Sequence, residues 1–122
     1  MKSVIFTGNI DYDSIAIFYA TADVFVIATL EDNWSLVVPE AMACGLPVAC
    51  SIFNGCHPEL IIPNRNGVTF NPFVPEDIVK SLGSFHNVDL KRYGEQSRII
   101  EHSYSPKNVA LNIKKAITKY LS

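Results

Sequence analysis

The chain has 122 residues, of which 48% are hydrophobic and 18% are charged, which is the size and composition of one globular domain. Its formal net charge of −2 argues against a nucleic-acid-binding protein, which normally has a basic face. No apolar run approaches the ~18 residues that span a bilayer, and the amino terminus does not have the pattern of a secretory signal. We therefore expect a soluble, cytoplasmic protein with no nucleic-acid partner.

Strands and helices alternate in the predicted structure of the first half of the chain. Short β-branched and apolar runs predict four strands, at residues 4–7, 24–29, 46–51 and 68–70. Apolar residues typical of a helix packed on a sheet recur at i, i+3, i+4 and i+7, namely Ile15, Phe18, Tyr19 and Ala22. Pro39 is tolerated only in a first helical turn, which places the start of a second helix near Ser35 or Leu36. Gly45 is expected to end that helix.

The chain is predicted to be helical from about residue 75 to residue 122. Pro75 opens one helix with acidic residues in its first turn, and apolar residues at helical spacing mark two more, around residues 90–100 and 109–120. We interpret residues 1–122 as one domain of the α/β class. Its expected architecture is a Rossmann-like parallel sheet with flanking helices, joined by right-handed crossovers.

The three cysteines, Cys44, Cys50 and Cys56, are interpreted as small buried residues rather than as a disulfide framework. Their number is odd, and no pair has the CxxC spacing. A metal site that uses Cys56 and the adjacent His57 is disfavoured, because neighbouring residues seldom converge on one ion. We expect no metal.

Ligands of parallel α/β sheets bind beyond the carboxyl ends of the strands. Three predicted segments are expected to meet at that edge: Thr7-Gly8-Asn9, Thr29-Leu30-Glu31 and Ser51 to Gly55. The stretch from Glu31 to Gly45 continues from one of them into the predicted helix, whose first backbone N–H groups favour an anion. Asp32 precedes the helix and Glu40 lies about one turn inside it, so both carboxylates could reach the same small volume.

This combination of donors and carboxylates suits a ligand that has both phosphates and sugar hydroxyls. N–H groups bind phosphates, whereas carboxylates repel them and accept hydrogen bonds from hydroxyls. The simpler alternative is that Asp32 caps the helix and Glu40 only complements the helix dipole. The spacing alone favours that alternative.

The stretch from Asp32 to Val48 resembles the retaining glycosyltransferases of the GT-B fold, family 4 (glycosyl transferases group 1). That family carries a glutamate, seven residues, a second glutamate and then Ala-Met-Ala-x-Gly-x-Pro-Val. Here seven residues separate Asp32 from Glu40, and Ala-Met-Ala-Cys-Gly-Leu-Pro-Val follows without a gap. Flanking stretches extend the resemblance to roughly residues 3–85. It implies that the chain is a partial C-terminal, nucleotide-sugar-binding domain of a GT-B enzyme.

The resemblance implies roles for the residues of this stretch. Glu40 is expected to bind the ribose hydroxyls, and the donor sugar is expected to contact Asp32 or, because Asp32 is one methylene shorter than the family's glutamate, the adjacent Glu31. Backbone N–H groups of Ser35, Leu36 and Val37 correspond to those that contact the sugar and phosphates, with Ser35 standing where the family usually has glycine. Trp34 is expected mainly to pack the loop. The full expected donor site is Gly8, Asn9, Glu31, Asn33, Trp34, Ser35, Leu36, Val37 and Glu40, with Asp32 and Glu40 as the catalytic pair.

The parent enzyme that the resemblance implies transfers a hexose from a UDP- or GDP-linked donor to a glycan or lipid acceptor, without a catalytic metal. The family's phosphate-binding arginine and lysine lie upstream of the matched region. In this sequence Lys2 is the only lysine or arginine before Arg65. The acceptor domain is also missing, so we expect a C-terminal fragment that is inactive alone. The parent is expected in the cytoplasm, with peripheral attachment to the inner membrane as one option.

Three alternatives remain open at this stage. The chain could be a nucleotide-sugar-binding module without transferase activity. It could be a structural remnant that self-associates through an exposed sheet edge. It could also derive from another GT-B enzyme, such as a sugar-nucleotide epimerase or a phosphorylase, although the Ala41 to Val48 match favours family 4. No side chain is an evident nucleophile or general base, and His57, His86 and His102 are scattered.

Overall fold

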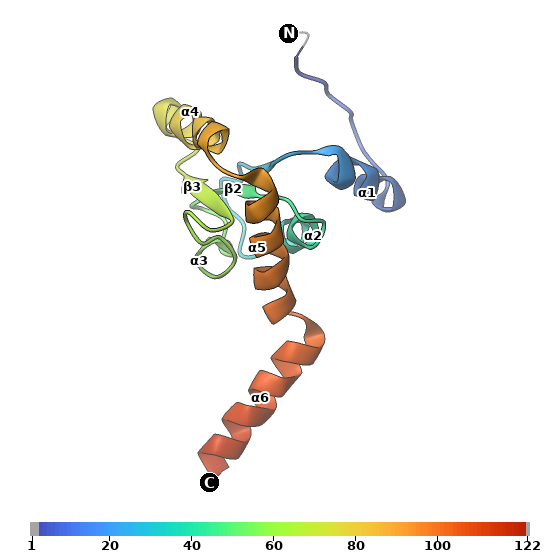
Figure 1. Ribbon diagram of the computed structural model, residues 1–122, viewed down its shortest axis with the longest axis vertical. Coiled ribbons are helices and arrows are strands. Elements are labelled where there is room, and N and C mark those ends of the chain that lie inside the picture. Colours follow the sequence, from blue (N-terminus) through green and yellow to red (C-terminus); the bar gives the residue numbers. More distant parts are fainter. Residues whose placement is uncertain (1–2, 122) are drawn as a thin grey trace.

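The computed structural model describes residues 3–121 and is built around a parallel sheet of three strands in the order β1-β2-β3 (Figure 1). The strands are β1 (Phe25–Ile27), β2 (Val48–Ser51) and β3 (Gly67–Phe70). The helices are α1 (Tyr12–Thr21), α2 (Val37–Ala43), α3 (His57–Leu60), α4 (Pro75–Gly83), the 3-10 turn η1 (Ser84–Asn87), α5 (Leu90–Ser103) and α6 (Pro106–Leu121). The predicted α/β, Rossmann-like parallel sheet with flanking helices is confirmed.

The middle strand, β2, holds the sheet together. Val48 lies opposite Phe25 of β1 on one side and opposite Gly67 of β3 on the other. All four residues of β2 are buried, whereas Val26 in β1 is 44% exposed. β1 is an edge strand of the sheet, and its side chains are less covered than those of β2.

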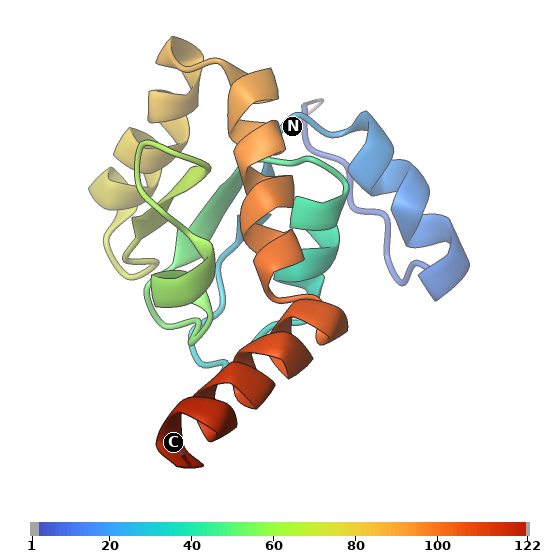
Figure 2. The same ribbon diagram turned by 60° about the horizontal axis from the view of Figure 1, so that its bottom comes forward.

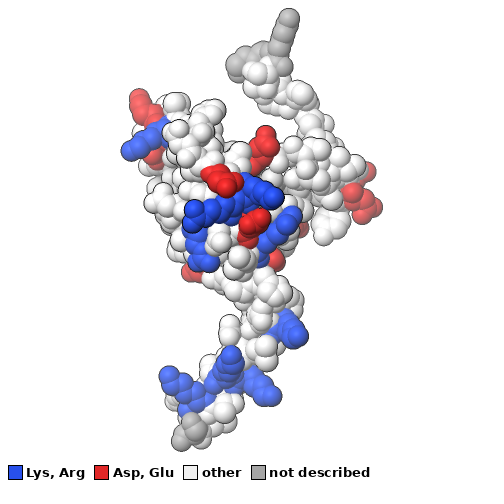
Figure 3. Space-filling view, viewed as in Figure 1, with Lys and Arg blue, Asp and Glu red and all other residues white. Residues whose placement is uncertain are grey.

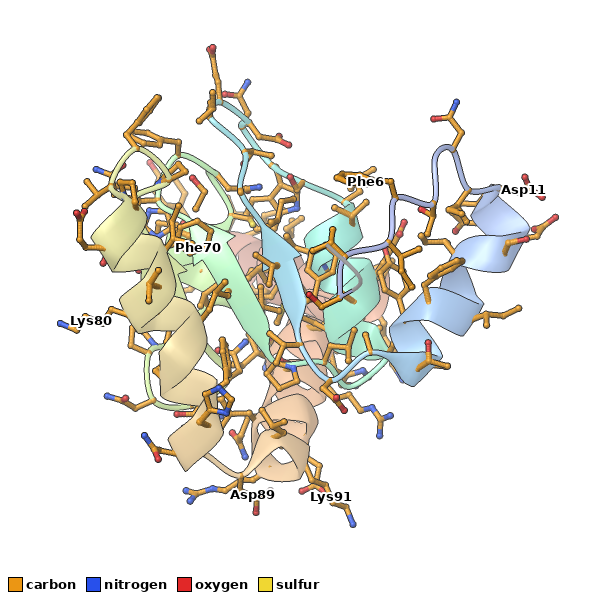
Figure 4. The ribbon with its side chains drawn as sticks, turned by 90° about the horizontal axis from the view of Figure 1, so that it is seen from above. Phe6, Asp11, Phe70, Lys80, Asp89 and Lys91 are labelled. Atoms are coloured by element: carbon orange, nitrogen blue, oxygen red, sulfur yellow. The ribbon has the colours of Figure 1, made fainter. Side chains whose placement is uncertain are left out.

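The two faces of the sheet have different cores, since side chains of a strand alternate between faces. Val48 and Cys50 pack with Met42 of α2 and Ile100 of α5. Ala49 packs on the other face with Phe70 and with Phe85 of η1. Figure 2 shows α5 running alongside α2, and Figure 4 shows α4 on the opposite side of the sheet from α2.

The strand predicted at residues 4–7 is wrong. Residues 3–11 have no regular secondary structure up to the start of α1, and they run away from the sheet (Figure 1). Ile5 and Phe6 are 84% and 94% exposed. A β-branched run favours an extended backbone, but a strand is stable only when neighbours pair with it and bury its faces. The segment 7–9 consequently does not join the carboxyl edge of the sheet.

The predicted helices are confirmed, with shifted ends. Pro39 lies in the first turn of α2, and the chain leaves that helix through Gly45, whose φ is +80°. In α1 the expected apolar stripe buries only Tyr19, while Phe18 is 42% exposed. The single-turn helix α3 and the turn η1 were not predicted, because four residues carry too little periodicity to recognise.

Asn66 links three segments of the chain through the hydrogen bonds of its side chain. Its Oδ1 accepts a hydrogen bond from the Ile62 backbone N–H at 2.8 Å. Its Nδ2 donates to the Leu60 carbonyl at 2.9 Å and to Ser97 Oγ of α5 at 3.4 Å. The side chain is completely buried. Its amide therefore satisfies backbone groups that water cannot reach.

We expect Asn66→Ala to lower the free energy of unfolding by about 2–3 kcal/mol, because it leaves buried polar backbone groups without partners. Chemical denaturation followed by circular dichroism measures the change. Asn87→Ala, at an exposed asparagine in η1, is the matched control and should change it by less than about 0.5 kcal/mol. Equal effects of the two substitutions would contradict this role for Asn66.

Candidate functional site

The loop between β1 and α2 lies at the carboxyl edge of the sheet and is anchored to the loop that follows β2. The Asp32 backbone N–H donates to the Phe53 carbonyl at 3.3 Å, and the Gly55 N–H donates to the Asp32 carbonyl at 2.7 Å. Asp32 and Asn54 thereby form an isolated parallel bridge beyond the ends of β1 and β2. The backbone around Asp32 is thus held by the sheet edge itself.

A chain of side-chain hydrogen bonds fixes the same loop from within. Asn54 Nδ2 donates to Ser35 Oγ at 2.6 Å and to Thr29 Oγ1 at 3.3 Å. Ser35 Oγ in turn donates to Asp32 Oδ2 at 2.5 Å. Asn54 and Ser35 are buried, at 0% and 5% exposure, so this network is shielded from water.

Asp32 closes the loop rather than capping the helix. Its Oδ1 accepts a hydrogen bond from the Trp34 backbone N–H at 3.1 Å, the pattern of an Asx turn. Helix α2 begins after Leu36 and has no side-chain cap. The helix-capping alternative for Asp32 is therefore not what the structure shows. Both carboxylate oxygens of Asp32 accept hydrogen bonds from the loop, and its side chain remains half-buried.

Glu40 lies on α2 and faces α1. Tyr19 Oη of α1 donates to Glu40 Oε2 at 3.4 Å. The pKa of Tyr19 is raised above its ordinary value, first by burial and then by the Glu40 carboxylate beside it. Between the two helices lies a groove of about 280 Å³ lined by Tyr12, Ile15, Ala16, Tyr19, Glu40, Ala43 and Cys44. The half-buried Glu40 carboxylate thus lines the groove and is available to a ligand, while one of its oxygens accepts the hydrogen bond from Tyr19.

Two buried cysteines lie beneath the loop. A hydrogen bond between its thiol and Cys56, and after that burial, raise the pKa of Cys50. The pKa of Cys56 is lowered, mainly by that hydrogen bond and in part by the Ser35 backbone N–H, although burial opposes the change. Both are free thiols and fully buried, as predicted, but Cys44 at the end of α2 is exposed, so that prediction is wrong for Cys44.

The structure does not bring all the predicted site residues together. Glu31 and Asn33 are exposed on the loop, and the exposed side chains of Leu36 and Val37 follow at the start of α2. Gly8 and Asn9 lie in the exposed amino-terminal segment, apart from the loop (Figure 1). Trp34 is 40% exposed and packs against Tyr104, with ring centroids 6.3 Å apart.

Three residues that shape the site were missed as site residues in the sequence. Asn54 and Gly55 were placed at the carboxyl edge of the sheet, within the segment Ser51 to Gly55, but were given no role there, and Tyr19 was assigned only to an apolar helical stripe. A polar residue in the loop that follows a buried strand was the available signal for Asn54, since that edge is where α/β sheets bind ligands. For Tyr19 the signal was its hydroxyl, which needs a partner when the ring is buried.

No helix among residues 3–121 is long and apolar enough to cross a membrane. Within the same described range, no three His, Cys, Asp or Glu side chains gather in a way that could hold a metal ion.

Comparisons with known proteins identify the family of this chain. A model of the family described as glycosyl transferases group 1 matches residues 1–105. The sulfoquinovosyl transferase SQD2 of Arabidopsis thaliana is 40% identical over 81 residues, 64% of this chain and 16% of that protein. An uncharacterized glycosyltransferase of Methanocaldococcus jannaschii, MJ1607, is 36% identical over 75 residues, 62% of this chain and 19% of that protein.

A solved structure extends the comparison to almost the whole chain. The sucrose-phosphate synthase of Thermosynechococcus elongatus superposes with a TM-score of 0.78 and 25% identity, over 98% of this chain and 31% of that one. The chain thus spans less than a third of each of these three proteins. Since the family model covers most of the sequence, the chain belongs to the glycosyl transferases group 1 family and has its GT-B type of fold.

Proposed function

We propose that this chain is the donor-binding part of a retaining, family 4 glycosyltransferase that transfers a hexose from a UDP- or GDP-linked sugar. The observation that carries the proposal is the double anchoring of the loop from Asp32 to Ser35. Backbone bonds to Phe53 and Gly55 and the buried Asn54–Ser35–Asp32 hydrogen bonds hold it in one conformation. A loop fixed in this way can present backbone donors and carboxylates to a ligand without an ordering cost.

Each carboxylate has a separate role in this proposal. Glu40 binds the ribose hydroxyls, because its carboxylate lines an open groove and retains acceptor sites beside the weak bond to Tyr19. In one version, Asp32 accepts hydrogen bonds from the donor sugar in addition to those it accepts within the loop. In the other, Asp32 only holds the loop, and the exposed Glu31 contacts the sugar. Leu36 and Val37 offer backbone N–H groups to the phosphates.

The remaining parts of the reaction belong to the parent protein in this proposal. The diphosphate also needs cations, and between Met1 and Asn64 the sequence has one basic residue against seven acidic ones. We propose that a preceding part of the donor-binding domain supplies the cations and that a separate amino-terminal domain binds a glycan or lipid acceptor. The small share of each relative that this chain covers supports this division. The chain alone would then bind donor without transferring it, and no metal takes part.

Glu40→Ala is expected to weaken binding of the UDP- or GDP-hexose by about 10- to 150-fold, corresponding to about 1.5–3 kcal/mol for a lost charged hydrogen bond. Isothermal titration calorimetry of the purified chain measures the change. Glu59→Ala, at an exposed glutamate of α3, is the matched control and should bind like the unsubstituted chain. Equal affinities for Glu40→Ala and Glu59→Ala would contradict the ribose role.

Asp32→Ala and Glu31→Gln are expected to separate the two possible sugar contacts. Substitution of the acid that contacts the sugar should weaken binding of the nucleotide-sugar by about 10-fold. The same substitution should change the affinity for the bare nucleotide much less. An equal loss for both ligands in Asp32→Ala, together with a sugar-selective loss in Glu31→Gln, would assign Asp32 to holding the loop. Unchanged selectivity in both variants would contradict a sugar contact by either residue.

A further inference from the structure

The loop of the candidate donor site, residues 32–36, is anchored more firmly at its start than at its end. Asp32 forms backbone hydrogen bonds with Phe53 and Gly55, which fix the start of the loop to the edge of the sheet. After Asp32, the backbone–backbone bonds of the loop within residues 3–121 go to α2, whose N–H groups donate to the last two carbonyls of the loop at 3.4 and 3.3 Å. The second half of the loop therefore depends on side chains for its contact with other segments.

Two side chains provide that contact. The buried Ser35 hydroxyl is hydrogen-bonded to Asn54 and Asp32. The indole of Trp34 packs against Tyr104 at the end of α5, with ring centroids 6.3 Å apart and ring planes tilted by 53°. Trp34 and Tyr104 are 40% and 42% exposed, so more than half of each residue is covered. Because the Trp34 backbone N–H also donates to Asp32 Oδ1 at 3.1 Å, the placement of the indole affects the carboxylate of the site.

Tyr104 is itself held in a fixed place by α5. The buried residues of that helix, Gly94, Ser97 and Ile100, recur at every third position and form one face. Gly94 lies directly against the backbone of Gly45, and Ile100 packs in the core with Met42 of α2. Figure 3 shows basic and acidic side chains side by side over the outer face of α5. A helix with one buried and one charged face can pack in only one orientation, so its end has a defined position.

The backbone at the end of α5 is also closed by hydrogen bonds. The Tyr104 N–H donates to the Glu101 carbonyl at 2.9 Å, and the Ser105 N–H donates to the His102 carbonyl at 3.0 Å. Asn108 Nδ2 donates to the same His102 carbonyl at 2.8 Å. Tyr104 therefore presents its ring to Trp34 from a rigid turn.

We propose that Tyr104 is a positioning residue for donor binding, which acts through its ring contact with Trp34. The contact holds the second half of the loop, so that the Asp32 carboxylate and the backbone N–H groups that follow Trp34 face the donor without an ordering cost. This inference rests on the proposed donor-binding function. Because the contact joins two rings, phenylalanine should replace tyrosine at this position, whereas alanine should not.

The hold on the loop can be measured without a ligand, because Trp34 is the only tryptophan of the chain and its fluorescence reports on this one contact. We expect Tyr104→Ala to increase quenching of Trp34 by acrylamide and to speed hydrogen exchange of the Trp34 amide about 3- to 10-fold, the range of one aromatic pair. Tyr104→Phe should change neither. Tyr120→Ala, at a tyrosine that is 92% exposed, is the matched control. Equal behaviour of Tyr104→Ala and Tyr120→Ala would overturn the proposal.

Calorimetric titration of the full chain with the UDP- or GDP-hexose measures the consequence for binding. Tyr104→Ala should weaken binding about 3- to 10-fold, and Tyr104→Phe should restore it. The unfolding midpoint should change little, because both rings are partly exposed. Adding Tyr104→Ala to Trp34→Ala should cause no further loss, since the two residues share one contact.

Two results of the titration would overturn the positioning role. One is a loop that Tyr104→Ala loosens while the affinity stays unchanged, and the other is additive losses in the double variant. A different result separates this inference from the proposed function. If the unsubstituted chain bound none of these donors while Tyr104→Ala still loosened the loop, the hold of Tyr104 on the loop would be confirmed, and the donor-binding function would be contradicted instead.

Discussion

Gly94→Ala is expected to lower the free energy of unfolding by about 3–4 kcal/mol, one of the largest effects of any single methyl group in this chain. Gly94 is buried in α5 where that helix crosses the turn after α2. An added Cβ would overlap the carbonyl oxygen of Gly45 and lie 2.9 Å from its carbonyl carbon. Because the obstacle is backbone, no side-chain rotation can relieve the overlap, and α5 must move away from α2.

Thermal or urea unfolding followed by circular dichroism measures this loss. Gly83→Ala is the matched control, since a Cβ at Gly83, at the end of α4, meets nothing within 4 Å. It should leave stability unchanged or raise it by up to about 1 kcal/mol, because alanine restricts the unfolded chain. Similar midpoints for the two variants would show that α5 does not pack against Gly45 as closely as the structure has it.

Gly55→Ala is expected to remove donor binding and to cost about 3 kcal/mol of stability, because it separates the two loops of the site. An added Cβ would overlap the Asn33 carbonyl oxygen and lie 2.8 Å from its carbonyl carbon. The Gly55 N–H donates to the Asp32 carbonyl at this point. The loop that contains Asp32 must therefore shift, which disturbs its buried hydrogen bonds.

Asn33→Ala is the control for this prediction, because Gly55 meets the backbone of Asn33 and not its exposed side chain. We expect Asn33→Ala to keep the unfolding midpoint of the unsubstituted chain. Calorimetric titration with a nucleotide-sugar, below the melting temperature of each variant, separates lost binding from lost folding. Gly55→Ala that stays folded and binds donor normally would contradict the anchoring role of the 53–55 loop.

The elements that local chemistry determines were predictable from the sequence. Pro39 and Gly45 place the start and end of α2, because proline is tolerated only in the first turn of a helix and a glycine with a left-handed backbone conformation ends one. The buried strand β2 was also recognisable from its apolar run. The stretch from Asp32 to Val48 was sufficient to indicate the family, which the match over residues 1–105 then established.

Elements that depend on distant neighbours were not predictable. Residues 4–7 have the composition of a strand, but pairing partners decide whether a strand forms, and here the segment stays exposed. The hydrogen bonds of Asn54 to Thr29 and Ser35, and of Asn66 to Ser97, join residues 19 to 31 positions apart. Nothing in a local pattern shows which amide will meet which hydroxyl. The exposure of Cys44 likewise depends on how α2 packs.

The most direct test of the central claim is a thermal shift of the purified chain with UDP, GDP and their hexose conjugates. A ligand that binds the folded state raises the melting temperature in proportion to ln(1 + [L]/Kd). We expect the melting temperature to rise with one of the two nucleotides and its hexose conjugate, and this rise to be lost in Glu40→Ala but not in Glu59→Ala. A cooperative melt that none of these ligands shifts would contradict a donor-binding site in this chain.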